Sequence, residues 1–192
     1  GGGAAGISVA ARLSNLDPSL DIAIIEPSDW HYYQPIWTLV GAGVLPKEES
    51  RRPMADFIPT SATWIQDRVE AFDPQNNPLK LASGQFLSYD QLVVALGIQV
   101  HWDAIEGLAG NIGKNGICSN YDYNTVDTTW HALQNIQGGN AIFTIPPMPI
   151  KCAGAPQKAL YLAADHWYRN GLLKNIEVHF FNAGAFLFGV AD

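Results

Sequence analysis

The sequence predicts an α/β fold built from two successive halves, residues 1–105 and 106–192, and three observations lead to this expectation. Short apolar runs alternate with amphipathic segments along the chain, which is typical of strands packed against helices. A glycine turn opens the first half, and an acidic residue follows the next apolar run. A loop at residues 103–120 carries four glycines and separates two such alternations. Together these features predict tandem Rossmann-like, nucleotide-binding units.

The first half begins with a predicted helix. Apolar residues recur at helical spacing over residues 4–16, and Asp17-Pro18 ends the helix. Residues 27–61 are irregular, with a short helix expected around residues 37–43. The apolar pattern predicts four strands, at residues 22–25, 62–72, 79–88 and 92–96, the last of them fully buried.

The second half repeats the alternation. Asn124 is expected to cap a helix that presents Val126, Trp130 and Leu133 on one face. Gly171 suits the C-terminal end of a second helix that begins near Pro156. The predicted strands of this half are residues 141–145 and 176–181.

The opening turn has the spacing of a dinucleotide site. Gly1, Gly3 and Gly6 match the G-x-G-x-x-G pattern, in which the glycines allow a tight turn, approach of a pyrophosphate and close helix packing. Glu26 ends the following strand, where it can accept hydrogen bonds from ribose hydroxyls. A glycine-rich turn without a ligand is the alternative. Because such a loop needs a buried strand before it, we expect the chain to be a fragment of a longer protein.

Composition and charge exclude several classes of function. Hydrophobic residues make up 47% of the chain, enough for a core, and charged residues only 15%. The net charge of -7 argues against a nucleic-acid partner. The two cysteines and five histidines show no disulfide-rich or metal-ligand spacing, so no metal site is expected.

The second half lacks a glycine fingerprint of its own. Its first strand is followed by a Pro-Pro-Met-Pro sequence at residues 146–149, and prolines have no amide proton to donate to a phosphate. Asn182, and not an acid, follows the next strand. We therefore expect this half not to bind a pyridine nucleotide.

Cys152 is the candidate for thiol chemistry. It lies just before a predicted helix, beside Lys151 and six residues before Lys158. Helix N-termini and nearby cations favour the nucleophilic thiolate. The alternative is a small buried hydrophobic residue, because free cysteines are often buried.

Six segments of the chain match the pattern of a known protein family: residues 1–6, 33–43, 95–99, 119–121, 139–144 and 151–158. The most specific are the Tyr-Gln-Pro segment and the Lys-Cys-Ala-Gly-Ala-Pro-Gln-Lys segment. In these segments the chain resembles the sulfide:quinone oxidoreductases, most closely the branch that includes the mitochondrial enzymes.

This resemblance implies a tandem Rossmann-like FAD/NAD(P)-binding fold, truncated at both ends, with FAD as cofactor. It implies sulfide as electron donor, quinone as acceptor, a small-molecule sulfur acceptor, and a membrane surface reached through a C-terminal region beyond this chain. The implied location is the mitochondrial inner membrane or the bacterial cytoplasmic membrane. Beyond the three turn glycines, the FAD contacts that it implies are Ala4, Ala5, Glu26, Gln34, Val69 and Gly97.

The resemblance also assigns the redox chemistry. Cys152 corresponds to one redox cysteine, its partner belongs to a later segment, and Cys118 is a weaker candidate. Sulfide would attack the disulfide of this pair, leaving a persulfide and a thiolate that reduces the flavin. The alternatives are an NADH:quinone oxidoreductase, a flavocytochrome sulfide dehydrogenase, or an inactive flavin-binding remnant.

Overall fold

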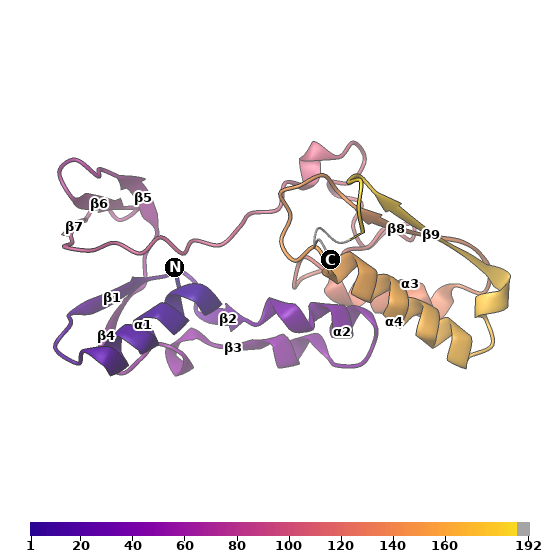
Figure 1. Ribbon diagram of the computed structural model, residues 1–192, viewed down its shortest axis with the longest axis horizontal. Coiled ribbons are helices and arrows are strands. Elements are labelled where there is room, and N and C mark those ends of the chain that lie inside the picture. The colour runs from indigo at the N-terminus through magenta and orange to yellow at the C-terminus, as the bar shows by residue number, and fades with distance from the viewer. Residues whose placement is uncertain (188–192) are drawn as a thin grey trace. The chain divides into compact units, whose positions relative to one another are not determined.

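The computed structural model describes residues 1–187, which form two compact units (Figure 1). Gly1–Tyr33 and Arg51–Gln99 form the first unit. Gln34–Ser50 and the residues from Val100 onward form the second. Because residues 34–50 leave one unit and join the other, no single point along the chain divides the two. The assignment of residues 1–105 to flavin binding and of 106–192 to a second half stays a prediction, and the last five residues lie outside the described part.

In the first unit, helix α1 leads directly into a parallel strand pair. α1 spans Ala4–Leu16 and ends where expected, with Asp17 in the C-cap position. β1 (Ile22–Ile25) pairs in parallel with β4 (Ala62–Ile65). Parallel neighbours need a crossover connection, so this arrangement confirms the predicted α/β class.

Two antiparallel sheets complete the first unit. β2 (Trp30–Tyr32) pairs with β3 (Arg51–Pro53). β5 (Val69–Phe72), β6 (Pro78–Leu81) and β7 (Phe86–Ser88) form a three-stranded sheet in that order.

The two long strands expected here are each interrupted by a turn. At the first interruption the amide of Arg68 donates to the carboxylate of Asp67 (2.7 Å). At the second, Gly84 takes a φ of +89°, a left-handed conformation that glycine adopts without strain. Polar residues and a glycine therefore divide each of the two expected strands, although the hydrophobic pattern had predicted each as continuous.

The prediction of a buried strand at residues 92–96 is wrong. The structure forms no strand there, and Val93, Val94 and Leu96 are 54%, 61% and 59% exposed. A strand needs a hydrogen-bonded neighbour, and in the described part of the chain none pairs with this segment. Apolar composition by itself therefore did not secure burial.

The second unit contains a complete strand–helix–strand motif. β8 (Gly139–Ile145) and β9 (Ile176–Asn182) run parallel, with Gly139 opposite Ile176 and Ile145 opposite Asn182. α4 (Ala155–Arg169) connects them and packs on β8. α2 (Trp37–Gly41) packs against α4 and against α3 (Val126–Asn135).

The start of α3 differs from expectation. Thr125, not Asn124, occupies the N-cap position, and no side chain caps the helix. The amides of Thr125 and Val126 instead donate to the carbonyl of Asp122 (3.2 and 2.9 Å). Asn124 donates to the Asp122 carboxylate through its backbone amide (2.9 Å) and through its side-chain Nδ2 (3.2 Å), so its side chain bonds back toward Asp122.

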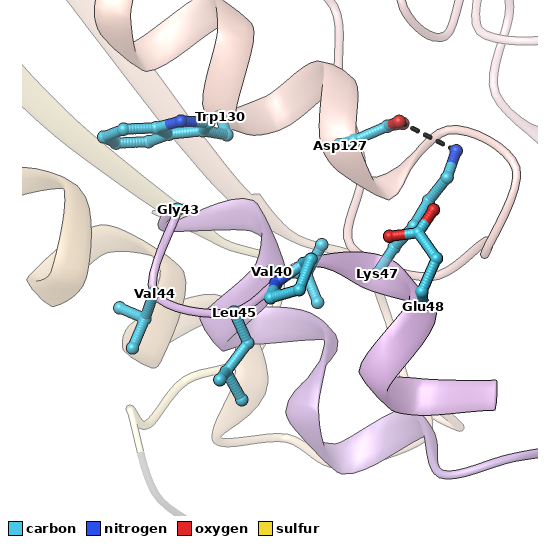
Figure 2. Close-up of a pocket in the computed structure, with 9 residues that line it drawn as sticks. Val40, Gly43, Val44, Leu45, Lys47, Glu48, Asp127 and Trp130 are labelled. Carbon is cyan, nitrogen blue, oxygen red and sulfur yellow. Dashed lines mark ion pairs between the residues drawn. The ribbon is translucent and has the colours of Figure 1, made fainter. Parts of the chain in front are cut away.

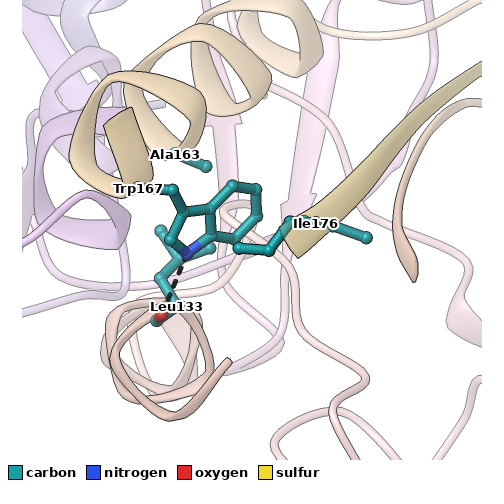
Figure 3. Packing of buried hydrophobic residues seen from close by; sticks show 5 residues of the cluster. Leu133, Ala163, Trp167 and Ile176 are labelled. Carbon is teal, nitrogen blue, oxygen red and sulfur yellow. Dashed lines mark hydrogen bonds between the residues drawn. The ribbon is translucent and has the colours of Figure 1, made fainter. Parts of the chain in front are cut away.

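A tryptophan organises the core of this unit (Figure 3). Trp167 on α4 is fully buried, and its indole N–H donates to the carbonyl of Leu133 at 3.1 Å. Ala163 and Ile176 pack in the same cluster, so one side chain joins α3, α4 and β9. Truncating such a residue to alanine costs about 3–5 kcal/mol.

Short 3-10 helices connect these elements at Gln34–Ile36, Lys47–Ser50, Met54–Asp56, Trp102–Ala104 and Leu173–Asn175. Over residues 1–187, no helix is both long enough and apolar enough to cross a bilayer.

Candidate functional site

The glycine turn forms the N-terminal end of α1. Gly3 is the N-cap residue, and the amide of Ile7 donates to the Gly3 carbonyl (3.1 Å) as the first bond of the helix. The amides of Ala4, Ala5 and Gly6 therefore have no carbonyl to reach within the helix. With the positive end of the helix dipole, they form a site suited to an anion such as a phosphate.

The three motif glycines differ in what a side chain would meet. A Cβ at Gly1 would collide with the carbonyl oxygen of Ala95, and one at Gly6 would collide with the carbonyl oxygen of Gly1. These two glycines permit close backbone packing. A Cβ at Gly3 meets no protein atom within 4 Å. The space beside Gly3 is therefore open, as a bound pyrophosphate requires.

Glu26 directly follows β1 and closes the turn from the other side. One carboxylate oxygen accepts from the amide of Gly2 (2.7 Å) and the other from the amide of Ser28 (2.9 Å). Each carboxylate oxygen has a second lone pair, so ribose hydroxyls can still donate to it. The Glu26 carbonyl also accepts from the Trp64 indole (2.9 Å), which joins the end of β1 to β4.

The other residues expected at this site lie in different places within the first unit. Gly97 adopts a φ of +74° with open space at its Cβ position, two residues beyond the Ala95 carbonyl that packs on Gly1. Val69 is half-buried opposite Leu81 at the start of β5, in the three-stranded sheet. The structure therefore brings Gly97's segment to the glycine turn, and it holds Val69 in a separate sheet.

In the second unit, Cys152 lies at the end of the proline loop that follows β8. It has a φ of +55°, and its carbonyl accepts from the amide of Ala155, the first residue of α4 (2.9 Å). Cys152 is an exposed residue. The interpretation of Cys152 as a small buried hydrophobic residue is therefore wrong.

Cys152 lines a cavity of about 70 Å³. Gln34, a predicted FAD contact, lines the same cavity although it lies far away in the sequence. Lys151 and Lys158 also line it. The full set of lining residues is Gln34, Pro35, Trp37, Thr38, Asn120, Tyr121, Lys151, Cys152, Ala155 and Lys158. The cavity is therefore a small space next to an exposed cysteine, and two lysines belong to its lining.

Asn120 and Tyr121 also line the cavity, and neither was among the sequence candidates. The Tyr121 hydroxyl donates to the carbonyl of Lys151 at 2.8 Å and reaches that of Cys152 at 3.5 Å. Asn120 packs so closely on Gly41 that a Cβ there would collide with its carboxamide. Their one sequence signal is that residues 119–121 belong to a segment that carries the family resemblance.

Cys118 occupies a different environment. It is half-buried, and its sulfur approaches the carbonyl of Gly116 at 3.6 Å. Burial raises the pKa of the Cys118 thiol, which lowers its thiolate fraction. It does not line the cavity beside Cys152, and the two cysteines are not bonded to each other.

A larger cavity of about 340 Å³ lies elsewhere in the second unit (Figure 2). Trp130 of α3 covers it at Gly43, where any Cβ would collide with the indole. Lys47 and Asp127 form an ion pair at its rim (2.8 Å). None of the candidate cofactor or redox residues lines it.

Comparison with known proteins places these features in context. The family model described as pyridine nucleotide-disulphide oxidoreductase matches residues 1–132. The mitochondrial sulfide:quinone oxidoreductase of Dictyostelium discoideum is 44% identical over 192 residues, covering 99% of this chain and 42% of that protein. The mitochondrial sulfide:quinone oxidoreductase of Mus musculus is 44% identical over 190 residues, with the same coverage. This chain thus spans 42% of the length of these relatives.

A solved structure gives the same answer. The sulfide:quinone oxidoreductase of the hyperthermophilic bacterium Aquifex aeolicus matches with a TM-score of 0.77 and 27% identity, covering 97% of this chain and 43% of that one. The predicted resemblance and the predicted fold class are confirmed. A flavin cofactor follows for this type of protein, and the open space at Gly3 fits its phosphates.

Proposed function

The chain belongs to the pyridine nucleotide-disulphide oxidoreductase family, and from this premise we propose that it contributes to a flavoprotein that oxidises sulfide and passes the electrons to quinone. The observation that carries the proposal is the exposed Cys152, held before α4 beside a small cavity with two lysines in its wall. The 44% identity to sulfide:quinone oxidoreductases over the chain supports it.

FAD is the proposed cofactor, and the glycine turn is its proposed binding element. The amides at the start of α1 would hold the pyrophosphate beside Gly3, and Glu26 would accept from the ribose. Gln34, Val69 and Gly97 are the proposed further contacts. When bound, FAD supplies the two-electron acceptor that this chemistry needs.

Cys152 is the proposed sulfur-handling residue. In the oxidised protein it would form a disulfide with a second cysteine outside these residues. Hydrosulfide attacks one sulfur, a new S–S bond forms, and the old S–S bond breaks. One cysteine then carries the persulfide, while the other leaves as a thiolate with the electron pair. Lys151 and Lys158 would attract the anion to the cavity and stabilise negative charge on sulfur.

The remaining partners follow from the chemistry of the substrates. Electrons would pass to quinone, which resides in a bilayer, so the protein is proposed to work at a membrane surface. The persulfide sulfur would pass to a small-molecule acceptor. Because the relatives named above include mitochondrial and bacterial enzymes, we propose the mitochondrial inner membrane or the bacterial cytoplasmic membrane as the location.

Flavin reduction by sulfide tests the proposal. In the full-length protein that contains this chain, Cys152→Ser should abolish anaerobic bleaching of the flavin absorbance by sulfide and leave the flavin bound. Oxygen cannot replace sulfur in the disulfide and persulfide steps. Cys118→Ser is the matched control and should keep most of the rate. Near-normal reduction by Cys152→Ser would overturn the mechanism, and loss of reduction in Cys118→Ser would transfer the role to that cysteine.

A further inference from the structure

We propose that Tyr121 is a positioning residue for Cys152, and that its hydroxyl holds the backbone of the loop that presents the thiol. The proposal rests on the function assigned above to Cys152. It concerns a residue whose hydroxyl bonds to backbone carbonyls of the cysteine loop. These are the two carbonyls that flank the Cα of Cys152, those of Lys151 and of Cys152 itself.

The Cys152 loop needs an external support. Cys152 has a φ of +55°, a left-handed conformation that a residue with a Cβ rarely adopts unless its surroundings enforce it. The residue is exposed, so packing contributes little to holding it. On the helix side, the Ala155 amide binds the Cys152 carbonyl at 2.9 Å. On the other side, the Tyr121 hydroxyl binds the Lys151 carbonyl at 2.8 Å.

Tyr121 is itself well placed to be a fixed donor. It is half-buried, and its amide donates to the Ser119 hydroxyl at 3.2 Å. Burial raises the pKa of the Tyr121 hydroxyl, and the charge of the nearby Cys152 raises it further. The phenol therefore keeps its one proton at neutral pH and donates it mainly to the Lys151 carbonyl at 2.8 Å, with the Cys152 carbonyl at 3.5 Å as a weaker second acceptor. The contact spans thirty positions of sequence, so it ties the proline loop to the segment before α3.

This geometry predicts a specific kinetic effect. Attack on a disulfide requires the sulfur atoms to be aligned, and small displacements slow such reactions strongly. The Tyr121 hydroxyl is engaged with the backbone carbonyls of the loop, so its proposed role is to hold the backbone and not to bind sulfide. Removing its hydroxyl should therefore lower the limiting rate of sulfide attack without changing the sulfide concentration that gives half of that rate.

The experiment compares Tyr121→Phe with Tyr161→Phe in the full-length protein. Tyr161 lies on α4 in the same unit and is 66% exposed, so its variant is a matched loss of one phenol oxygen. Two quantities are measured: the rate of anaerobic flavin reduction as a function of sulfide concentration, and amide hydrogen exchange of residues 151–155. For Tyr121→Phe we expect about a fivefold to tenfold lower limiting rate, an unchanged half-saturating sulfide concentration and faster exchange of the loop. Tyr161→Phe should match the wild type.

The outcomes separate this proposal from the function on which it rests. If the wild type itself is not reduced by sulfide, the proposed function fails, and the exchange data still decide whether Tyr121 holds the loop. Loop exchange in Tyr121→Phe equal to that of the wild type would overturn the inference, whatever the rate. A raised half-saturating concentration with an unchanged limiting rate would also overturn it, because the hydroxyl would then act in binding sulfide.

Discussion

The turn before α1 and the loop before α4 occupy equivalent positions in the two units. Each precedes a helix that is followed by a strand of a parallel pair, β1 after α1 and β9 after α4. Their chemistry differs. The first offers free amides and open space at Gly3. The second contains Pro146, Pro147 and Pro149, which have no amide proton, and ends in an exposed thiol. The N-terminal end of a helix can therefore serve as a phosphate cradle or as the support of a nucleophile, and the loop residues decide which.

The strand ends repeat the contrast. Glu26 follows β1 and keeps lone pairs available for a ribose. Asn182 ends β9, and its carboxamide is engaged locally, accepting from the amide of Gly184 (3.0 Å) and donating to the carbonyl of Phe186 (2.6 Å). An asparagine held in its own turn is poorly placed to recognise a ribose. The second unit thus differs from the first at both positions that a dinucleotide would contact.

The largest effect expected from this contrast is a failure of pyridine nucleotides to reduce the flavin. Stopped-flow mixing of the full-length protein with NADH or NADPH should bleach the flavin no faster than buffer does, whereas sulfide should bleach it rapidly. The proline loop offers no amides to a second pyrophosphate. Reduction by NADH at the rate seen with sulfide would break the comparison and favour an NADH:quinone oxidoreductase.

Gly3→Val should remove most of the bound flavin. A side chain at Gly3 meets no protein atom within 4 Å, so the fold has room for it, but it would occupy the space proposed for the pyrophosphate. We expect flavin occupancy of the purified protein to fall about tenfold, equivalent to about 1.4 kcal/mol of binding free energy.

Two measurements make the Gly3→Val result decisive. Circular dichroism should show an intact fold, and absorbance at the flavin band gives the occupancy. Gly184→Val is the control, because a Cβ at Gly184 meets other atoms only at ordinary contact distances of 3.4 Å or more and its backbone is not left-handed. Stoichiometric flavin in Gly3→Val would count against the site.

Glu26→Gln should weaken flavin binding by a smaller factor. Each carboxylate oxygen accepts from one backbone amide and keeps a lone pair for the ribose, whereas the carboxamide replaces one of these oxygens by an NH₂ donor, so one acceptor for the ribose is lost. Loss of about one net hydrogen bond, about 1 kcal/mol, corresponds to about a fivefold weaker affinity. Flavin titration of the apoprotein measures it. Glu177→Gln on β9 is the control, since that side chain is 76% exposed, and an equal loss in both variants would refute the role of Glu26.

The smallest effect concerns Cys118. Burial raises the pKa of its thiol, so the folded protein holds less thiolate at a given pH than the unfolded chain does. At a pH near the ordinary thiol pKa of about 8.5, its alkylation by iodoacetamide should be a few-fold slower in the folded than in the unfolded state. The alkylation rate of the folded protein should keep rising at higher pH. Peptide mass spectrometry resolves Cys118 from other thiols. Equal rates in the folded and denatured protein would contradict the effect of burial.

Local patterns in the sequence predicted much of the fold. The helices at Ala4–Leu16 and Ala155–Arg169 and the strands at Ile22–Ile25 and Ile176–Asn182 lie close to their expected positions. Each depends on periodicity and on punctuation by proline, glycine or aspartate within the segment itself. Predictions failed where an element depends on a partner strand elsewhere in the chain. At residues 92–96, no strand in the described part of the chain pairs with the segment.

The sequence by itself determined the two candidate chemistries of this protein. The spacing of Gly1, Gly3 and Gly6 before a helix, with Glu26 at the end of the next strand, depends only on short-range geometry. The place of Cys152 before a helix and beside Lys151 is equally local.

Only the tertiary structure decided which distant segments meet. It joined residues 34–50 to the second unit, so that Gln34 and Cys152 line one cavity. It also brought the Tyr121 hydroxyl to the Lys151 carbonyl, thirty positions away. Such contacts depend on how whole elements pack around a core such as that of Trp167, and the packing depends on many residues at once. For this reason no local pattern could have identified Tyr121 as the residue that holds the cysteine loop.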